Sequence, residues 1–144
     1  MSGLRTVREV MSPEVTTLRE DDSLSIADDV MKLGRIRHMP VVDAEGRAVG
    51  IVSQRDLFRG ALTTFLGYGE HAQRGVLNAV KVADVMASPP RTIGPDEDLT
   101  EAARRLERYK IGCLVVVEGG DPDGKPVGIL TEGDFVRLHM PARL

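Results

Sequence analysis

An internal repeat limits the folds that are open to this chain. Val7-Arg8-Glu9-Val10-Met11 returns 75 residues later as Val82-Ala83-Asp84-Val85-Met86. The two copies stay in register as far as Val42 and Val117, after which the second copy carries three extra residues. A unit of about 55 residues buries little apolar surface by itself. We therefore expect two copies of one small fold that pack together and share a core.

Each copy begins with the same helical pattern. A short helical turn ends near Val10-Met11, an extended segment follows, and an amphipathic helix comes next. Ser23 and Asp98 take the N-cap positions of the two amphipathic helices. We expect the buried helix faces to be Leu24, Ala27, Val30, Met31 and Gly34 in the first copy, and Leu99, Ala102, Ala103, Leu106 and Tyr109 in the second.

A β-hairpin and a closing helix complete each copy. The hairpin signal is two apolar runs on either side of a polar, glycine-containing turn. The closing helix is expected to begin at Ser53 in the first copy and at Thr131 in the second. The expected strands are 39–42 and 48–52 in the first copy, and 113–117 and 126–130 in the second.

The repeat also predicts the domain organisation. We expect an α+β fold with a first repeat over 1–60, a connection over 61–81 and a second repeat over 82–144. The connection contains Phe65, Leu66 and Tyr68, which could pack on the body of the protein or on a partner chain. The sequence leaves both possibilities open.

Composition excludes several classes of function. The 144-residue chain has a net charge of −3 and 3% aromatic residues, which disfavours a nucleic-acid surface. The longest apolar runs, such as Leu114–Val117, are too short to span a membrane, and the N-terminus lacks the apolar region of a signal peptide. Cys113 is the only cysteine, so a cytoplasmic location without an intramolecular disulfide is expected. Cys113 itself is expected to be a small buried residue, because it begins an apolar strand.

The junction between hairpin and closing helix carries a repeated polar motif. It reads Gly50-Ile51-Val52-Ser53-Gln54-Arg55-Asp56 in the first copy and Gly128-Ile129-Leu130-Thr131-Glu132-Gly133-Asp134 in the second. The glycine allows a ligand or another backbone to approach the strand closely. The hydroxyl and carboxylate at a helix start could hold a sugar diol and a phosphate. They could equally cap the helix and favour its dipole.

These residues resemble a known family, the tandem cystathionine β-synthase (CBS) domain pair, also called a Bateman module. The resemblance covers nearly the whole chain and rests on Val10-Met11-Ser12-Pro13, on Val85–Pro89, on Arg37–Asp43 and on the two Gly-x-x-[Ser/Thr]-x-x-Asp motifs. It implies two pseudo-twofold-related repeats packed sheet to sheet, with two related clefts between them. It also implies a disc-like homodimer and adenosine-type ligands, which across the family include AMP, ADP, ATP, S-adenosylmethionine and NAD-type dinucleotides.

The resemblance also implies a role for each matching residue. Asp56 and Asp134 would accept hydrogen bonds from ribose hydroxyls, and Ser53 and Thr131 would contact ribose or the α-phosphate. The further residues implied in ligand binding are Thr17 and Thr92 as polar contacts on the entering strands, Ile51 and Ile129 along the adenine slot, and Arg37 and His38 facing the phosphates.

The second repeat departs from this pattern. Gly112-Cys113-Leu114-Val115 stands where the first repeat has Arg37-His38-Met39-Pro40, so it offers no cation. We therefore expect the two clefts to differ in affinity, with one of them empty or holding a less charged ligand. The sequence does not show which aspartate shares a cleft with Arg37.

Catalysis and metal binding find little support in the sequence. There is no Gly-x-Ser-x-Gly elbow and no His-Glu-x-x-His pair, and His71 and His139 have no partners at metal-ligand spacing. We therefore expect a non-enzymatic protein that requires no cofactor or metal and that uses neither nucleic acid nor membrane as a partner. The favoured reading is a sensor of adenine nucleotides that acts through a separate, unknown protein. The alternative is a ligand-free homodimerising scaffold.

Overall fold

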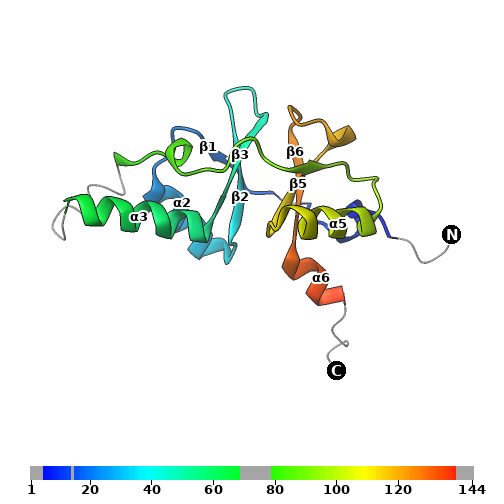
Figure 1. Ribbon diagram of the computed structural model, residues 1–144. Coiled ribbons are helices and arrows are strands. Elements are labelled where there is room, and N and C mark those ends of the chain that lie inside the picture. The colour runs from blue at the N-terminus through cyan, green and yellow to red at the C-terminus, as the bar shows by residue number, and fades with distance from the viewer. Residues whose placement is uncertain (1–4, 14, 69–78, 139–144) are drawn as a thin grey trace. The chain divides into compact units, whose positions relative to one another are not determined.

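The chain folds into two compact units that differ from the two sequence repeats. The computed structural model describes residues 5–13, 15–68 and 79–138 (Figure 1). The first-repeat unit comprises Thr16–Pro90, and the second-repeat unit comprises Met1–Val15 together with Arg91–Leu144. The start of the chain therefore belongs to the second-repeat unit, and residues 82–90 belong to the first-repeat unit.

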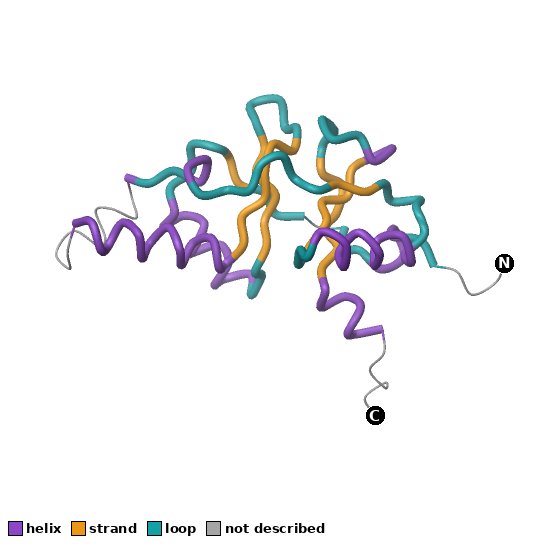
Figure 2. The backbone as a smooth tube through the Cα atoms, viewed as in Figure 1, coloured by secondary structure: helices purple, strands orange, loops and turns teal. Residues whose placement is uncertain are grey.

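The first-repeat unit is a small sheet flanked by helices (Figure 2). Its three strands lie in the order β1-β2-β3, with β1 parallel to β2 and β2 antiparallel to β3. Helices α2 and α3 contact each other, and α3 also contacts β3. The elements are β1 (Leu18–Arg19), α2 (Leu24–Gly34), β2 (His38–Val42), β3 (Ala48–Ser53), α3 (Gln54–Tyr68) and the 3-10 helix η2 (Val82–Asp84).

The second-repeat unit has the same topology. Its strands lie in the order β4-β5-β6, again with one parallel and one antiparallel pair. The predicted α+β fold with two small sheets flanked by helices is thus confirmed. The elements are α1 (Val7–Val10), β4 (Thr92–Ile93), α5 (Leu99–Tyr109), β5 (Cys113–Val117), the 3-10 helix η3 (Glu118–Gly120), β6 (Pro126–Thr131) and α6 (Glu132–Leu138).

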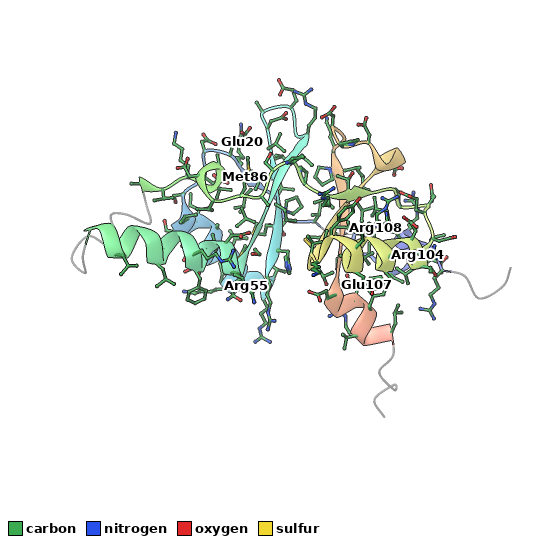
Figure 3. All side chains as sticks on the ribbon, in the orientation of Figure 1. Glu20, Arg55, Met86, Arg104, Glu107 and Arg108 are labelled. Carbon is green, nitrogen blue, oxygen red and sulfur yellow. The ribbon has the colours of Figure 1, made fainter. Side chains whose placement is uncertain are left out.

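The predicted helix faces are confirmed at most positions and wrong at three. In α2 and α5 the equivalent residues Leu24, Ala27 and Met31, and Leu99, Ala102 and Leu106, are buried. Gly34, Ala103 and Tyr109 are exposed instead. Ala103 stands next to Arg104 on a helix whose outer surface carries Arg104, Glu107 and Arg108 (Figure 3), so only a narrow stripe faces the sheet. Tyr109 is the last residue of α5, and its ring lies 3.9 Å from the Arg91 guanidinium carbon.

The two amphipathic helices begin in different ways at the side-chain level. Ser23 is the N-cap of α2, and its side chain accepts a hydrogen bond from the Ile26 amide. Asp98 takes the expected N-cap position of α5, but its side chain makes no capping hydrogen bond. In both helices the first amide donates to a distant backbone carbonyl, Leu99 to Arg5 at 2.8 Å and Leu24 to Val80 at 3.0 Å. A backbone carbonyl from the start of the chain therefore satisfies one of the free amides of α5.

Each unit is completed by the segment that begins the other repeat in the sequence. Val7 is 0% exposed and belongs to the apolar core of the second-repeat unit, while Val82 is 0% exposed in the core of the first-repeat unit. Further along these segments, Ser12 exchanges two backbone hydrogen bonds with Ile129, and Ala87 exchanges two with Ile51. We call residues 5–13 and 79–90 the crossing segments.

The described part of the chain contains no helix that is both long and apolar enough to cross a membrane. Cys113 is buried in β5, which confirms the expected burial.

Candidate functional site

The first polar motif lies where β3 ends and α3 begins. The Ser53 amide donates to Oδ2 of Asp56 at 2.8 Å, and the Asp56 amide donates to Oγ of Ser53 at 3.1 Å. These reciprocal bonds satisfy two backbone amides at the helix start, in the manner of a capping box. The capping role that the sequence left open is therefore present, and it uses one of the two carboxylate oxygens of Asp56.

Arg37 and His38 lie at the same end of the β2–β3 hairpin as this motif. The Gln54 amide donates to the Arg37 carbonyl at 2.8 Å, which holds the loop before β2 against the start of α3. His38 is the register partner of Ser53 in the antiparallel pair. The structure therefore brings four of the predicted site residues into one region of the first-repeat unit, and the aspartate in the same unit as Arg37 is Asp56.

This region has an open carboxylate oxygen and several cations without ion pairs. Asp56 is half-buried, and within the described residues no group donates a hydrogen bond to its Oδ1. Arg37, Arg55 and Arg59 are exposed and form no ion pair with any residue that the structure describes. Figure 3 shows Arg55 at the start of α3. The region can therefore offer a ligand an acceptor, Oδ1 of Asp56, together with the positive charge of Arg37.

The second polar motif has the same backbone construction but a fully engaged carboxylate. The Thr131 amide donates to Oδ2 of Asp134 at 2.8 Å, and the Glu132 amide donates to the Gly112 carbonyl at 3.0 Å. The Arg137 guanidinium donates to the other oxygen, Oδ1 of Asp134. Asp134 is only 6% exposed. The two aspartates that look equivalent in the sequence therefore differ in their surroundings.

The remaining candidate residues are divided between the two units. Thr17 is exposed directly before β1. Thr92 donates its hydroxyl to the Gly120 carbonyl at 3.2 Å, so this hydroxyl is used by the longer turn of the second repeat. Ile51 and Ile129 are half-buried. Their implied contacts with a nucleotide stay predictions.

The glycines of both motifs have a structural partner that the sequence did not identify. A Cβ atom on Gly50 would lie 2.4 Å from Sδ of Met86, and one on Gly128 would lie 2.5 Å from Sδ of Met11. Of the two explanations left open for these glycines, the structure thus supports close approach by another part of the chain. Both methionines lie in the crossing segments, so each Val-Met motif packs against the glycine of a Gly-x-x-[Ser/Thr] motif in the same unit.

Sequence reasoning also missed the arginine three positions after each aspartate. Asp-x-x-Arg occurs in both copies, as Asp56 with Arg59 and as Asp134 with Arg137. Residues at this spacing lie on one helix face, so the pattern was available as a signal. Among the described residues, no group of three or more His, Cys, Asp or Glu side chains is placed to hold a metal ion. His71 and His139 lie outside the described residues.

Comparison with known proteins agrees with this architecture. A CBS domain-containing protein of Dictyostelium discoideum is 30% identical over 132 residues, which are 92% of this chain and 89% of that protein. The chain also aligns over 92% of its length, at 32% identity, with a homoserine O-acetyltransferase of Methanococcoides burtonii, but it spans only 24% of that enzyme.

Two solved structures of similar fold contain bound nucleosides or nucleotides. The structure of CBSX2 in complex with AMP has a TM-score of 0.73 and 28% identity, and the match covers 92% of this chain and 94% of that one. A CBS domain pair in complex with 5′-methylthioadenosine and S-adenosyl-L-methionine has a TM-score of 0.74 and 25% identity. This match covers 94% of this chain and 95% of that one.

The family model of the CBS domain matches residues 7–62 and 82–140, which is most of the chain in two consecutive copies. Together with the two sheets of identical topology, this match shows that the chain belongs to the CBS domain family and is a tandem CBS-pair regulatory module.

Proposed function

We propose that this CBS pair binds an adenosine-type nucleotide of the AMP, ADP or ATP class through the junction of β3 and α3. The observation that carries the proposal is the open Oδ1 of Asp56, which lies in the same region as the exposed Arg37. A carboxylate oxygen accepts hydrogen bonds from vicinal ribose hydroxyls, and an arginine pairs with phosphate oxygens. The solved complexes of similar CBS pairs with AMP and with adenosine derivatives support the same ligand class.

The remaining residues take supporting roles in this proposal. Ser53 offers a hydroxyl to the ribose or the α-phosphate, Thr17 adds a polar contact, and His38 adds a second nitrogen-bearing side chain near the phosphates. Ile51 supplies an apolar surface for the adenine ring. In the second-repeat unit Thr92, Ile129, Thr131 and Asp134 are the matching residues, and there the ligand is absent or bound more weakly.

The regulatory output follows from differential affinity. A nucleotide that binds one arrangement of the chain more tightly than another shifts the population toward that arrangement. We propose that a separate protein reads this shift.

The nucleotide proposal predicts ligand-dependent stabilisation of the protein. AMP at about 100 times its dissociation constant adds about 2.7 kcal/mol to the free energy of unfolding, which raises Tm by several degrees. The Asp56→Asn variant should lose most of this shift, because the amide cannot accept two hydrogen bonds with the same strength as a carboxylate. The shift in Tm is measured by thermal unfolding of protein that has been freed of bound nucleotide and then mixed with AMP, ADP, ATP or S-adenosylmethionine.

Asp21→Asn is the matched control for this experiment, since Asp21 is an exposed carboxylate beside the start of α2. It should keep the full nucleotide-dependent shift. If none of the four ligands raises Tm of the wild-type protein, the nucleotide proposal is wrong, and the ligand-free scaffold becomes the better reading.

An apolar stripe on the first-repeat unit favours self-association. A homodimer is compatible with the nucleotide sensor and with the ligand-free scaffold. Phe58, Leu62 and Leu66 follow each other at four-residue intervals along α3 and are 64%, 58% and 82% exposed. Leu33 on the contacting helix α2 is 87% exposed. Exposed large apolar side chains on two contacting helices are typical of an interaction site. We propose that a second copy of the chain covers this stripe, because a twofold axis pairs one patch with itself.

Leu62→Glu should convert this homodimer to a monomer, because the substitution places a charge in the middle of the stripe. Sedimentation velocity at micromolar protein concentration measures the change. Val136→Glu is the control, since Val136 is 61% exposed but lies on α6 of the other unit. A monomeric wild-type protein, or a dimer that persists in Leu62→Glu, would show that the stripe is not the interface.

A further inference from the structure

The two copies of the motif differ in one local contact. In the second copy Arg137 folds back along α6 and donates to Oδ1 of Asp134. In the first copy Arg59 stands at the same distance along the helix from Asp56, but these two residues form no hydrogen bond or ion pair. The same Asp-x-x-Arg sequence is therefore closed in one repeat and open in the other.

The residue before the aspartate differs between the two copies. Gly133 precedes Asp134, and a Cβ atom built on Gly133 would lie 3.3 Å from Nη1 of Arg137 and 3.5 Å from Oγ1 of Thr131. A distance of 3.3 Å is tighter than nine in ten contacts that real Cβ atoms make, so the Arg137 guanidinium would have to shift by a few tenths of an ångström. The equivalent residue in the first copy is Arg55, which has both a Cβ atom and a positive charge. A side chain there crowds the path of Arg59, and its charge repels the Arg59 guanidinium.

We propose that Arg137 is an intramolecular latch on Asp134, permitted by Gly133, and that Arg55 prevents the equivalent latch of Arg59 on Asp56. The latched aspartate has a structural role, because its two oxygens accept hydrogen bonds from Thr131 and Arg137 and its side chain is 6% exposed. The unlatched aspartate keeps one oxygen available. The pair Arg55 and Gly133 thus decides which of the two repeats can accept a ligand hydroxyl.

The first test needs no ligand and compares two double-mutant cycles by thermal unfolding. Arg137→Gln and Asp134→Asn should be non-additive, since each one breaks the same contact, with a coupling that moves Tm by about 1–4 °C. Arg59→Gln and Asp56→Asn should be additive within error. Equal coupling in both cycles, or coupling in neither, overturns the proposal.

The second test rests on the proposed nucleotide function and uses AMP as the probe, with calorimetric titration as the readout. Arg55→Gly introduces the residue that stands at the equivalent position of the second repeat. It should weaken AMP binding about two- to fivefold, because Arg59 can then form an ion pair with Asp56 that competes with AMP, and an exposed ion pair contributes about that much. Adding Arg59→Gln to Arg55→Gly should restore the wild-type affinity. Arg55→Ala retains the Cβ atom and should bind AMP within about twofold of the wild type.

The outcomes separate the latch from the nucleotide function. An affinity loss that is equal in Arg55→Ala and Arg55→Gly, and that Arg59→Gln does not restore, overturns the latch, because Arg55 would then contact AMP directly. If wild-type protein does not bind AMP at all, the nucleotide proposal fails at this site. In that case the two ligand-free cycles still decide whether the latch exists.

Discussion

Val7→Asp is expected to unfold the second-repeat unit, although Val7 belongs to the first sequence repeat. Val7 is 0% exposed and packs in one core with Leu99, Leu114 and Leu130. A carboxylate at this position would be buried without a partner, which costs several kcal/mol, about 3 or more. A loss of that size lowers Tm by roughly 10 °C in a chain of this length.

Hydrogen exchange locates the effect of this substitution. Protection should fall over residues 91–138 and stay higher over 16–68. Val82→Asp is the mirror-image variant, since Val82 is 0% exposed in the other core, and it should reverse the pattern. Val136→Asp is the surface control and should change little. Loss of protection in Val7→Asp that is confined to 16–68 would contradict the assignment of the crossing segments.

Gly128→Val is expected to be the second most damaging of these substitutions. The first added carbon would lie 2.5 Å from Sδ of Met11 and 3.0 Å from the Ser12 carbonyl oxygen. The methionine side chain can move, but the Ser12 carbonyl accepts a hydrogen bond from the Ile129 amide and cannot move without losing it. Overpacking of this kind costs about 1–3 kcal/mol, which corresponds to a drop in Tm of about 3–10 °C. Thermal unfolding of the variant measures it.

Gly34→Ala tests whether the cost at Gly128 comes from crowding or from the loss of glycine as such. The nearest atoms to a Cβ atom on Gly34 would belong to the Ile36 side chain, at 3.6–3.9 Å, which is ordinary contact. This variant should be neutral or slightly stabilised, because alanine favours the helix over glycine. Gly128→Val in a Met11→Ala background should recover part of its loss. No recovery, together with an equal loss in Gly34→Ala, would show that crowding is not the cause.

The strands and helices of each unit could be predicted from the sequence because they depend on local patterns. The apolar runs at Met39–Val42 and Cys113–Val117 and the capping residue Ser23 each carry their own signal. The crossing segments could not be assigned, because a repeat shows that two segments are alike without showing which unit each one joins. Asp98 illustrates the same limit, since the group that bonds the start of α5 is the Arg5 carbonyl, far away in the sequence.

The sequence predicted the motif of the candidate site but not whether the carboxylate of each motif is open or already engaged. The spacing of Ser53 and Asp56 correctly indicated a strand that runs into a helix with polar groups at the junction. The same spacing at Thr131 and Asp134 gave no sign that the second carboxylate is covered. That outcome depends on whether an arginine one turn away can fold back, and hence on the space left by Gly133.

The crossing segments have a consequence for the ancestry of the chain. A lone repeat cut at its sequence boundaries would carry an N-terminal segment that its own unit does not use, and it would lack the one it needs. Such a fragment could complete its core only by trading segments with a second molecule. After fusion of two gene copies, the exchange of segments would take place within one polypeptide instead of between two molecules. The two halves of this chain, produced as separate fragments, would then each supply the piece that the other is missing.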